Sequence, residues 1–144
     1  MGMQDCIRFA GENPICFVAT TEGEQARVRA LALWFANEEG FHFAILSPKQ
    51  LRRQLKANPK IEVCFYNNPA DLMEAKQMRL TGEAEFVDDR ELQERAAKEG
   101  EFLDQLTGKA LGHLWEVLRI HSGEACFWTL ADTLREPELE RVRF

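Results

Sequence analysis

The chain has 144 residues, 45% of them hydrophobic, and its 18 basic and 24 acidic side chains leave a formal net charge of −6. This length predicts one domain, spanning residues 1–144, and the composition excludes a disordered chain. The negative charge argues against a general nucleic-acid-binding protein, and no apolar run approaches the roughly 18 residues of a membrane span. Without a signal core at the N-terminus, and with four scattered cysteines, we expect a cytoplasmic protein with free thiols.

The first third of the chain predicts a short helix and three strands. The helix is expected over residues 3–11, and the strands over 15–22 (ICFVATTE), about 25–36, and 41–46 (FHFAIL). The connecting turns, EGEQ and NEEG, are short. Strands joined in this way pair with their neighbours, so we expect an antiparallel meander.

The segment SPKQLRRQLKANPK predicts a second helix. Ser47 is a candidate N-cap, Pro48 suits the first helical position, and Asn58-Pro59 ends the helix. Two strands follow, in IEVCFYN and QMRLTGEAEFV, and Gly82 indicates a bend or a bulge in the second of them.

The last third predicts an acidic helix over DDRELQERAAKEGEFLDQL, with Asp88 or Asp89 as its cap, and a helical turn at about 108–115. A hairpin over Ser122-Gly123 and a strand near LERVRF complete the chain. Many antiparallel strands with few helices favour a mainly β barrel or sandwich with helices at its ends.

Two arginines in the second predicted strand require an explanation. Arg27 and Arg29 lie two residues apart, so both project from the strand face that also carries Leu31 and Leu33. Permanent cations in line with leucines need either an anion or open water. An exposed strand face on which leucines are tolerated is one interpretation, and an anion-binding site is the other.

The start of the second helix offers a possible partner for these arginines. A helix N-terminus presents unpaired N–H groups, Ser47 adds a hydroxyl and Lys49 a charge, which together suit a phosphate. Pairing of the second and third strands would bring the arginines towards this turn. The alternative is a solvated basic helix face, because the segment also contains Arg52, Arg53, Lys56 and Lys60.

Two other residue types bear on a ligand. The three histidines lack the spacing of metal ligands, so we expect no metal site. Gln77 begins a strand after a polar loop, where a side chain is commonly just solvated. Its amide both donates and accepts hydrogen bonds, which also suits the pyrimidine edge of a flavin.

In order and spacing, ARVRALAL, GFHFAILSPKQLRRQLKANPKIEVCFYN and KQMRLTGEAEFV resemble the FMN-binding split barrels related to pyridoxamine 5′-phosphate oxidase. The resemblance covers about residues 14–90. In that family a strand of R-x-V-x-L type, an aromatic-Thr pair, an S-x-K turn and a glutamine face FMN. The matching positions here are Arg27, Val28, Arg29, Ala30, Leu31, Phe43, Ala44, Ser47, Lys49 and Gln77.

Several departures separate the chain from oxidases of the B6 vitamer. Ala32 stands where they carry a lysine, Pro48 replaces an arginine, and Ala44 lacks the hydroxyl of a threonine. The chain also ends at Phe144, without their longer C-terminal region. The smaller relatives, including the nitroimidazole-resistance type, are therefore the better comparison, and oxidation of pyridoxamine phosphate is not expected.

The resemblance implies an antiparallel split barrel that forms a homodimer with FMN at the interface, where Gln77 would come from the partner subunit. It implies an FMN-dependent reductase or oxidase of a small molecule. Leu31, Leu33 and Phe43 are expected to need cover by the second chain. The alternative function is a non-catalytic flavin- or haem-binding module. His42, the histidine on a predicted strand, would then be the candidate axial ligand.

Overall fold

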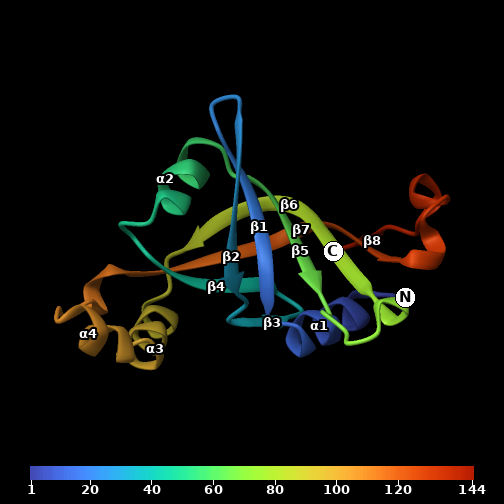
Figure 1. Ribbon diagram of the computed structural model, residues 1–144. Helices are drawn as coiled ribbons and strands as arrows, with labels where there is room; N and C mark the ends of the chain where they lie inside the picture. Colours follow the sequence, from blue (N-terminus) through green and yellow to red (C-terminus); the bar gives the residue numbers. More distant parts are fainter.

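One curved antiparallel sheet organises the protein, with helices packed at its ends (Figure 1). The computed structural model describes residues 1–144. The strands are β1 (Ile15–Glu22), β2 (Gln25–Ala32), β3 (Phe35–Asn37), β4 (Gly40–Leu46), β5 (Lys60–Tyr66), β6 (Lys76–Val87), β7 (Trp115–Thr129) and β8 (Val142–Arg143). The helices are α1 (Met3–Glu12), α2 (Gln50–Ala57), α3 (Arg90–Glu99) and α4 (Phe102–Thr107).

The strands follow the order β2-β1-β5-β6-β7-β4-β3, and β8 adds to β7. All neighbours are antiparallel. Because β2 and β3 do not pair with each other, the sheet stays open between them. The fold is thus the predicted mainly β split barrel with flanking helices. None of its helices is long and apolar enough to cross a membrane.

The expected meander is correct for β1 and β2 but wrong for the next step. The strand predicted at about 25–36 breaks at Leu33 and Trp34, and only its end, β3, pairs with β4. The backbone N–H of Leu33 donates to Pro14 O at 2.7 Å, whereas that of Trp34 donates to His42 O at 2.9 Å. The chain therefore changes its pairing partner within two residues, which carries it from one half of the sheet to the other.

The hairpin predicted over Ser122-Gly123 is wrong, because β7 runs without a break through these residues. Gly123 lies opposite Gly82 on β6, and a Cβ added to Gly123 would lie 2.1 Å from Thr81 O. The glycine thus permits a close approach of two long strands instead of a turn. The irregularity predicted at Gly82 is confirmed, since the register shifts between Gly82 and Ala84.

The start of α2 also differs from the prediction. The helix begins at Gln50, its N-cap is Lys49, and no side chain caps it, so neither the predicted Ser47 cap nor a helical Pro48 is present. The N–H of Lys49 donates to Leu46 O instead, which forms a turn before the helix. The predicted end of α2 at Asn58 and the cap of α3 by Asp89 are both confirmed.

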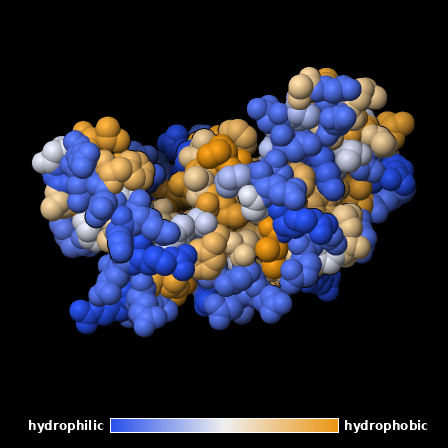
Figure 2. Space-filling view, turned by 90° about the horizontal axis from the view of Figure 1, so that it is seen from below, coloured by the Kyte–Doolittle hydropathy of each residue, from blue (hydrophilic) through white to orange (hydrophobic).

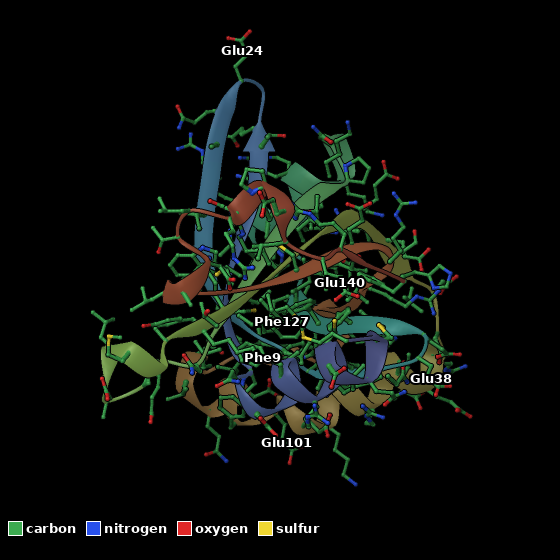
Figure 3. All side chains as sticks on the ribbon, turned by 90° about the vertical axis from the view of Figure 1, so that its right-hand side faces the viewer. Phe9, Glu24, Glu38, Glu101, Phe127 and Glu140 are labelled. Carbon is green, nitrogen blue, oxygen red and sulfur yellow. The ribbon has the colours of Figure 1, made fainter.

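The hydrophobic core is built from residues of the sheet and includes residues from α1 and α2. Phe9 of α1 and Phe127 of β7 point towards each other, with ring centroids 5.4 Å apart (Figure 3). Leu33 and Phe43 belong to this core, and Leu31 packs against it, so the expectation that they need cover by another chain is wrong.

Candidate functional site

Arg29 reaches from β2 to α2 through neutral partners. Its Nη1 donates to Val18 O at 3.2 Å and to Thr20 Oγ1 at 2.8 Å, and its Nη2 donates to Gln54 Oε1. Thr20 and Gln54 are both buried, and the Thr20 hydroxyl donates to Gln54 Oε1 at 2.6 Å. No carboxylate pairs with Arg29, and partial burial lowers the pKa of its guanidinium.

Arg27, in contrast, meets an acid of its own hairpin. Its Nη2 donates to Glu22 Oε1 at 3.0 Å, and Arg53 Nη2 of α2 donates to Glu22 Oε2 at 2.9 Å. Hydrogen bonds from Arg53, Arg27 and Gln54, in that order, lower the pKa of the Glu22 carboxyl. Glu22 is therefore the internal anion of a cluster that otherwise carries three arginines.

A cleft of about 420 Å³ opens beside this cluster, between α2 and the β1–β2 turn. Figure 1 shows the hairpin rising past α2. The side chains of the cleft are mainly polar, and Glu22 and Arg53 both line it. The lining residues are Thr21, Glu22, Gly23, Arg53, Gln54, Ala57 and Asn58. An anion that enters the cleft would meet Arg53, and would compete with Glu22 for it.

The arginines therefore contact the middle of α2 and not the turn at its start, where the sequence predicted that they would converge. Gln54 and Arg53 contact the arginine cluster, whereas no hydrogen bond joins it to Ser47 or Lys49. The Ser47 N–H donates to Leu114 O at 2.9 Å. Lys49 is exposed and forms no ion pair, so it is a free cation at the start of α2.

The opposite face of the β1–β2 hairpin is apolar and open. Pairing of Phe17 with Ala30 and of Ala19 with Val28 places these side chains on one face. Phe17 is 47% exposed and Val28 is 70% exposed. Ile15, at 59%, extends the same surface. These residues, and not those of the core, form an uncovered apolar surface on the sheet.

Gln77 lies on this same face, although two strands, β1 and β5, lie between its strand β6 and β2. The Cys64 thiol donates to Gln77 Oε1 at 3.5 Å, and Cys64 lies opposite Phe17. Within one chain, Gln77 is thus apart from Arg27 and Arg29. It is nevertheless on the sheet surface that carries Val28.

Phe43 and Ala44 are adjacent on β4 but have different surroundings. The Phe43 side chain is completely buried in the core, so only its backbone is available to a ligand. Ala44 is partly exposed and lines a second cavity together with Ala32, Leu33 and Trp34. The structure therefore brings the end of β2 and the middle of β4 together at a place separate from the arginine cluster.

Three residues of this cluster, Thr20, Glu22 and Gln54, were not predicted from the sequence. A sequence signal for Glu22 and Thr20 existed, because a tight EGEQ turn fixes the register of the hairpin and places Thr20 opposite Arg27 and Glu22 opposite Gln25. No comparable signal pointed to Gln54, whose contact with Arg29 depends on how α2 packs against the sheet.

The cysteines and histidines do not form a reactive or metal-binding group. All four cysteines are free, and burial raises the pKa of Cys6 to about 11 and that of Cys16 to about 12, so these thiols stay protonated. No group of three or more His, Cys, Asp or Glu residues is arranged to hold a metal ion. His42 is 1% exposed and stacks on Phe35 with ring centroids 4.1 Å apart.

Comparison with known proteins places this geometry in context. The family model described as pyridoxamine 5′-phosphate oxidase matches residues 3–118. A solved NimC/NimA family protein from Clostridium acetobutylicum is 26% identical, with a TM-score of 0.74, over 99% of this chain and 92% of that one. No curated protein matches the chain.

Two further solved structures share the fold alone. An FAD-binding protein from Mesorhizobium loti is 14% identical, with a TM-score of 0.66, over 88% of this chain and 94% of that one. HutZ, the haem storage protein of Vibrio cholerae, is 17% identical, with a TM-score of 0.63, over 90% of this chain and 95% of that one. The same barrel thus occurs in proteins described by different cofactors.

Proposed function

Because the chain belongs to the pyridoxamine 5′-phosphate oxidase family, we propose that it is an FMN-dependent oxidoreductase that reduces or oxidises a small molecule. The observation that carries the proposal is the arginine cluster, in which Arg27 and Arg53 bond Glu22 and Arg29 bonds Gln54, beside a cleft that Arg53 lines. Several cations gathered in one cluster suit a doubly charged phosphate better than a single carboxylate. Pyridoxamine phosphate remains an unexpected substrate, since Ala32 offers no cation.

The residues present fit FMN in two parts. Arg27 would hold the phosphate, and Ser47 and Lys49, which no hydrogen bond joins to the cluster, would act as further donors from the turn before α2. Arg29 would reach the outer flavin edge or the substrate. The backbone of Val28, Ala30 and Leu31 would line the flavin ring, as would that of Phe43 and Ala44. Bound FMN supplies the redox chemistry by accepting or donating a hydride or electrons.

A homodimer would complete the site. The exposed surface of Ile15, Phe17 and Val28 needs a partner, and Gln77 lies on the same side of the sheet. Two-fold packing of this surface would bring Gln77 of the partner subunit towards the flavin-lining strand. A monomer in light scattering at micromolar concentration would contradict both the dimer and this site.

The phosphate assignment is tested with FMN and riboflavin, which differ by that group. Arg27→Ala and Lys49→Ala should each weaken FMN by about one to two decades and leave riboflavin nearly unaffected, as measured by fluorescence titration. Lys56→Ala is the matched control, because Lys56 lies 4.1 Å above the Phe86 ring and not at the helix start. Equal losses of FMN and riboflavin would show that the arginine does not bind the phosphate.

The second candidate is a non-catalytic flavin- or haem-binding module, and the observation in its favour is the likeness to HutZ. A haem iron would need an axial ligand, and His42 is buried against Phe35, where it leaves no room for a haem. We therefore favour flavin. Absorption of the purified protein decides between them, through flavin bands or a Soret band.

The four free cysteines support a cytoplasmic location.

A further inference from the structure

Two pairs of exposed apolar side chains lie outside the β1–β2 hairpin. Leu72 and Met73, in the 3₁₀ turn before β6, are 65% and 77% exposed. Phe102 and Leu106 of α4 are 60% and 75% exposed. Figure 2 shows hydrophobic residues on the lobe at the left, which contains α3 and α4, and in the middle of the molecule. Single apolar residues are normal at a protein surface, whereas neighbouring ones mark a contact surface, so each pair needs a partner.

The turn before β6 holds its apolar pair on a fixed backbone. The Met73 N–H donates to Asp71 Oδ1 at 2.9 Å, and Asn67 Nδ2 donates to Glu74 O at 2.9 Å. These hydrogen bonds tie the turn to itself and to the end of β5. The two apolar side chains therefore project from a backbone that is already ordered, so covering them costs little loss of backbone freedom.

The pair on α4 borders a candidate flavin residue. Phe102 and Leu106 are four residues apart, so they lie on one face of the helix. Asp104 Oδ1 accepts from the Leu111 N–H at 3.1 Å, which ties the helix to the segment that follows it. Phe102 also lines the second cavity, together with Ala44. A chain that covers this face of α4 therefore lies next to a position proposed to line the flavin ring.

The positions of the two pairs fit a two-fold dimer. Figure 1 shows β1 and β2 crossing the middle of the molecule, with α4 at one end and the turn before β6 near the other end. A two-fold axis through the exposed surface of the hairpin would bring each end either to its own copy or to the opposite end of the partner.

Gln77 selects the second arrangement. The proposed site places Gln77 of the partner subunit beside the strand that lines the flavin. Met73 is four residues before Gln77, so the two Cα atoms lie within roughly 14 Å of each other. The turn of the partner subunit therefore arrives beside the flavin site, where Phe102 and Ala44 line one cavity.

We propose that Leu72 and Met73 of each subunit pack on the face of α4 formed by Phe102 and Leu106 in the other subunit. This inference rests on the proposed function through Gln77. The flexible Met73 side chain adapts to an aromatic surface, and its sulfur favours contact with a ring such as that of Phe102. The contact occurs twice in a symmetric dimer, and it makes residues of both chains part of the wall beside Ala44.

Cross-linking of two variants tests the arrangement. Met73→Cys and Leu106→Cys are made in a Cys64→Ser background, because Cys64 is the one native cysteine that is not buried. When both variants are expressed in the same cells, a short bismaleimide should link them into a covalent dimer, whereas either variant alone should stay uncrosslinked. A covalent dimer from one variant alone would show that like ends meet, and would overturn the proposal. A dimer in light scattering without cross-links in the mixture would overturn it too.

Dimer affinity provides a second measurement. Met73→Ser and Leu106→Ser should each weaken the dimer about tenfold or more in analytical ultracentrifugation, since each removes two apolar contacts per dimer. Leu134→Ser is the matched control, because Leu134 is 94% exposed and lies outside both pairs. Equal weakening in all three variants would overturn a specific contact.

An FMN titration of the unchanged protein separates this inference from the proposed function. Cross-linking of the mixed variants in a protein that binds no FMN would support the interface and contradict the FMN proposal. A dimer that binds FMN but gives no mixed cross-link would leave the FMN proposal intact and overturn the contact between the turn and α4.

Discussion

The arginine cluster and the second cavity, which Trp34 and Ala44 line, differ in how their polar groups are satisfied. In the cluster, every strong charge has a partner within the chain, since Glu22 accepts from Arg27 and Arg53 while neutral groups accept from Arg29. Trp115, one of the mainly hydrophobic residues that line the cavity, instead carries a buried Nε1–H that has no acceptor. A ligand of the cluster must therefore displace an internal acid, whereas the cavity offers mainly apolar contacts. Substitutions in each region test this difference.

The largest effect is expected from Gly100→Ala at the cavity. The added methyl would overlap the indole of Trp115, and overpacking of this kind costs roughly 1–3 kcal/mol in the free energy of unfolding. Urea unfolding followed by tryptophan fluorescence measures it. Gly11→Ala is the control, because nothing lies within 4 Å of a Cβ there and a helical alanine should stabilise the protein slightly. Equal responses at both positions would show that the cavity wall is not rigid.

A smaller loss is expected from Thr20→Val beneath the cluster. The change removes the hydroxyl that accepts from Arg29 and donates to Gln54. Arg29 Nη1 still donates to Val18 O, and Gln54 Oε1 still accepts from Arg29 Nη2. The cost should be about 1 kcal/mol in the free energy of unfolding. Thr81→Val, at an exposed strand position, is the matched control. An unchanged midpoint for Thr20→Val would indicate that the network contributes nothing to stability.

The third effect depends on pH. Burial, followed by the nearby charge of Arg119, lowers the pKa of His42 from its ordinary value of 6.5. Between these two pKa values, His42 is protonated in the unfolded chain but neutral in the folded protein. Stability is full above pH 6.5 and falls as the pH drops from there towards the lower pKa of the folded state. His42→Phe should remove this part of the pH dependence in denaturant titrations.

His121→Phe is the control for this change, because His121 is exposed. That variant should keep the decline in stability below pH 6.5. If His42→Phe declines as steeply as the unchanged protein, the imidazole is not the group that titrates.

The smallest effect on stability, and the clearest effect on binding, is expected from Glu22→Gln. Exposed ion pairs contribute little to folding, so the unfolding midpoint should hardly move. Loss of the internal anion should strengthen FMN binding severalfold without changing riboflavin binding. Glu24→Gln is a matched control, since Glu24 projects from the tip of the same hairpin (Figure 3). Weaker FMN binding in Glu22→Gln would mean that the acid organises the site instead of competing with the ligand.

The strands were predictable from the sequence wherever the side-chain pattern decides the structure. Alternation identified β1, β5 and β6 almost to the residue, and Asp89 was recognisable as a cap. The errors lie where backbone partners decide. Leu33 and Trp34 look like any other residues of a strand, and only the positions of Pro14 and His42 divide the segment there.

The candidate site shows the same division. The period of the strand indicated that Arg27 and Arg29 share a face, and the hydrogen bonds of both residues are on the side of α2. The sequence did not reveal that Arg27 meets Glu22 while Arg29 meets Thr20 and Gln54. Partners on other elements depend on packing, which no local pattern encodes. The unpaired Nε1 of Trp115 was hidden for the same reason.

The order of the strands has a consequence for how the chain reaches its native state. The β1–β2 hairpin is local, so its pairing closes a short loop. Apart from β3, the only neighbour of β4 is β7, where Ala44 pairs with Val117. During synthesis, β4 with its buried Phe43 therefore cannot pair with β7 until that much later strand has been made. Until then one edge of β4 stays unpaired, which leaves this strand exposed to aggregation while the protein folds.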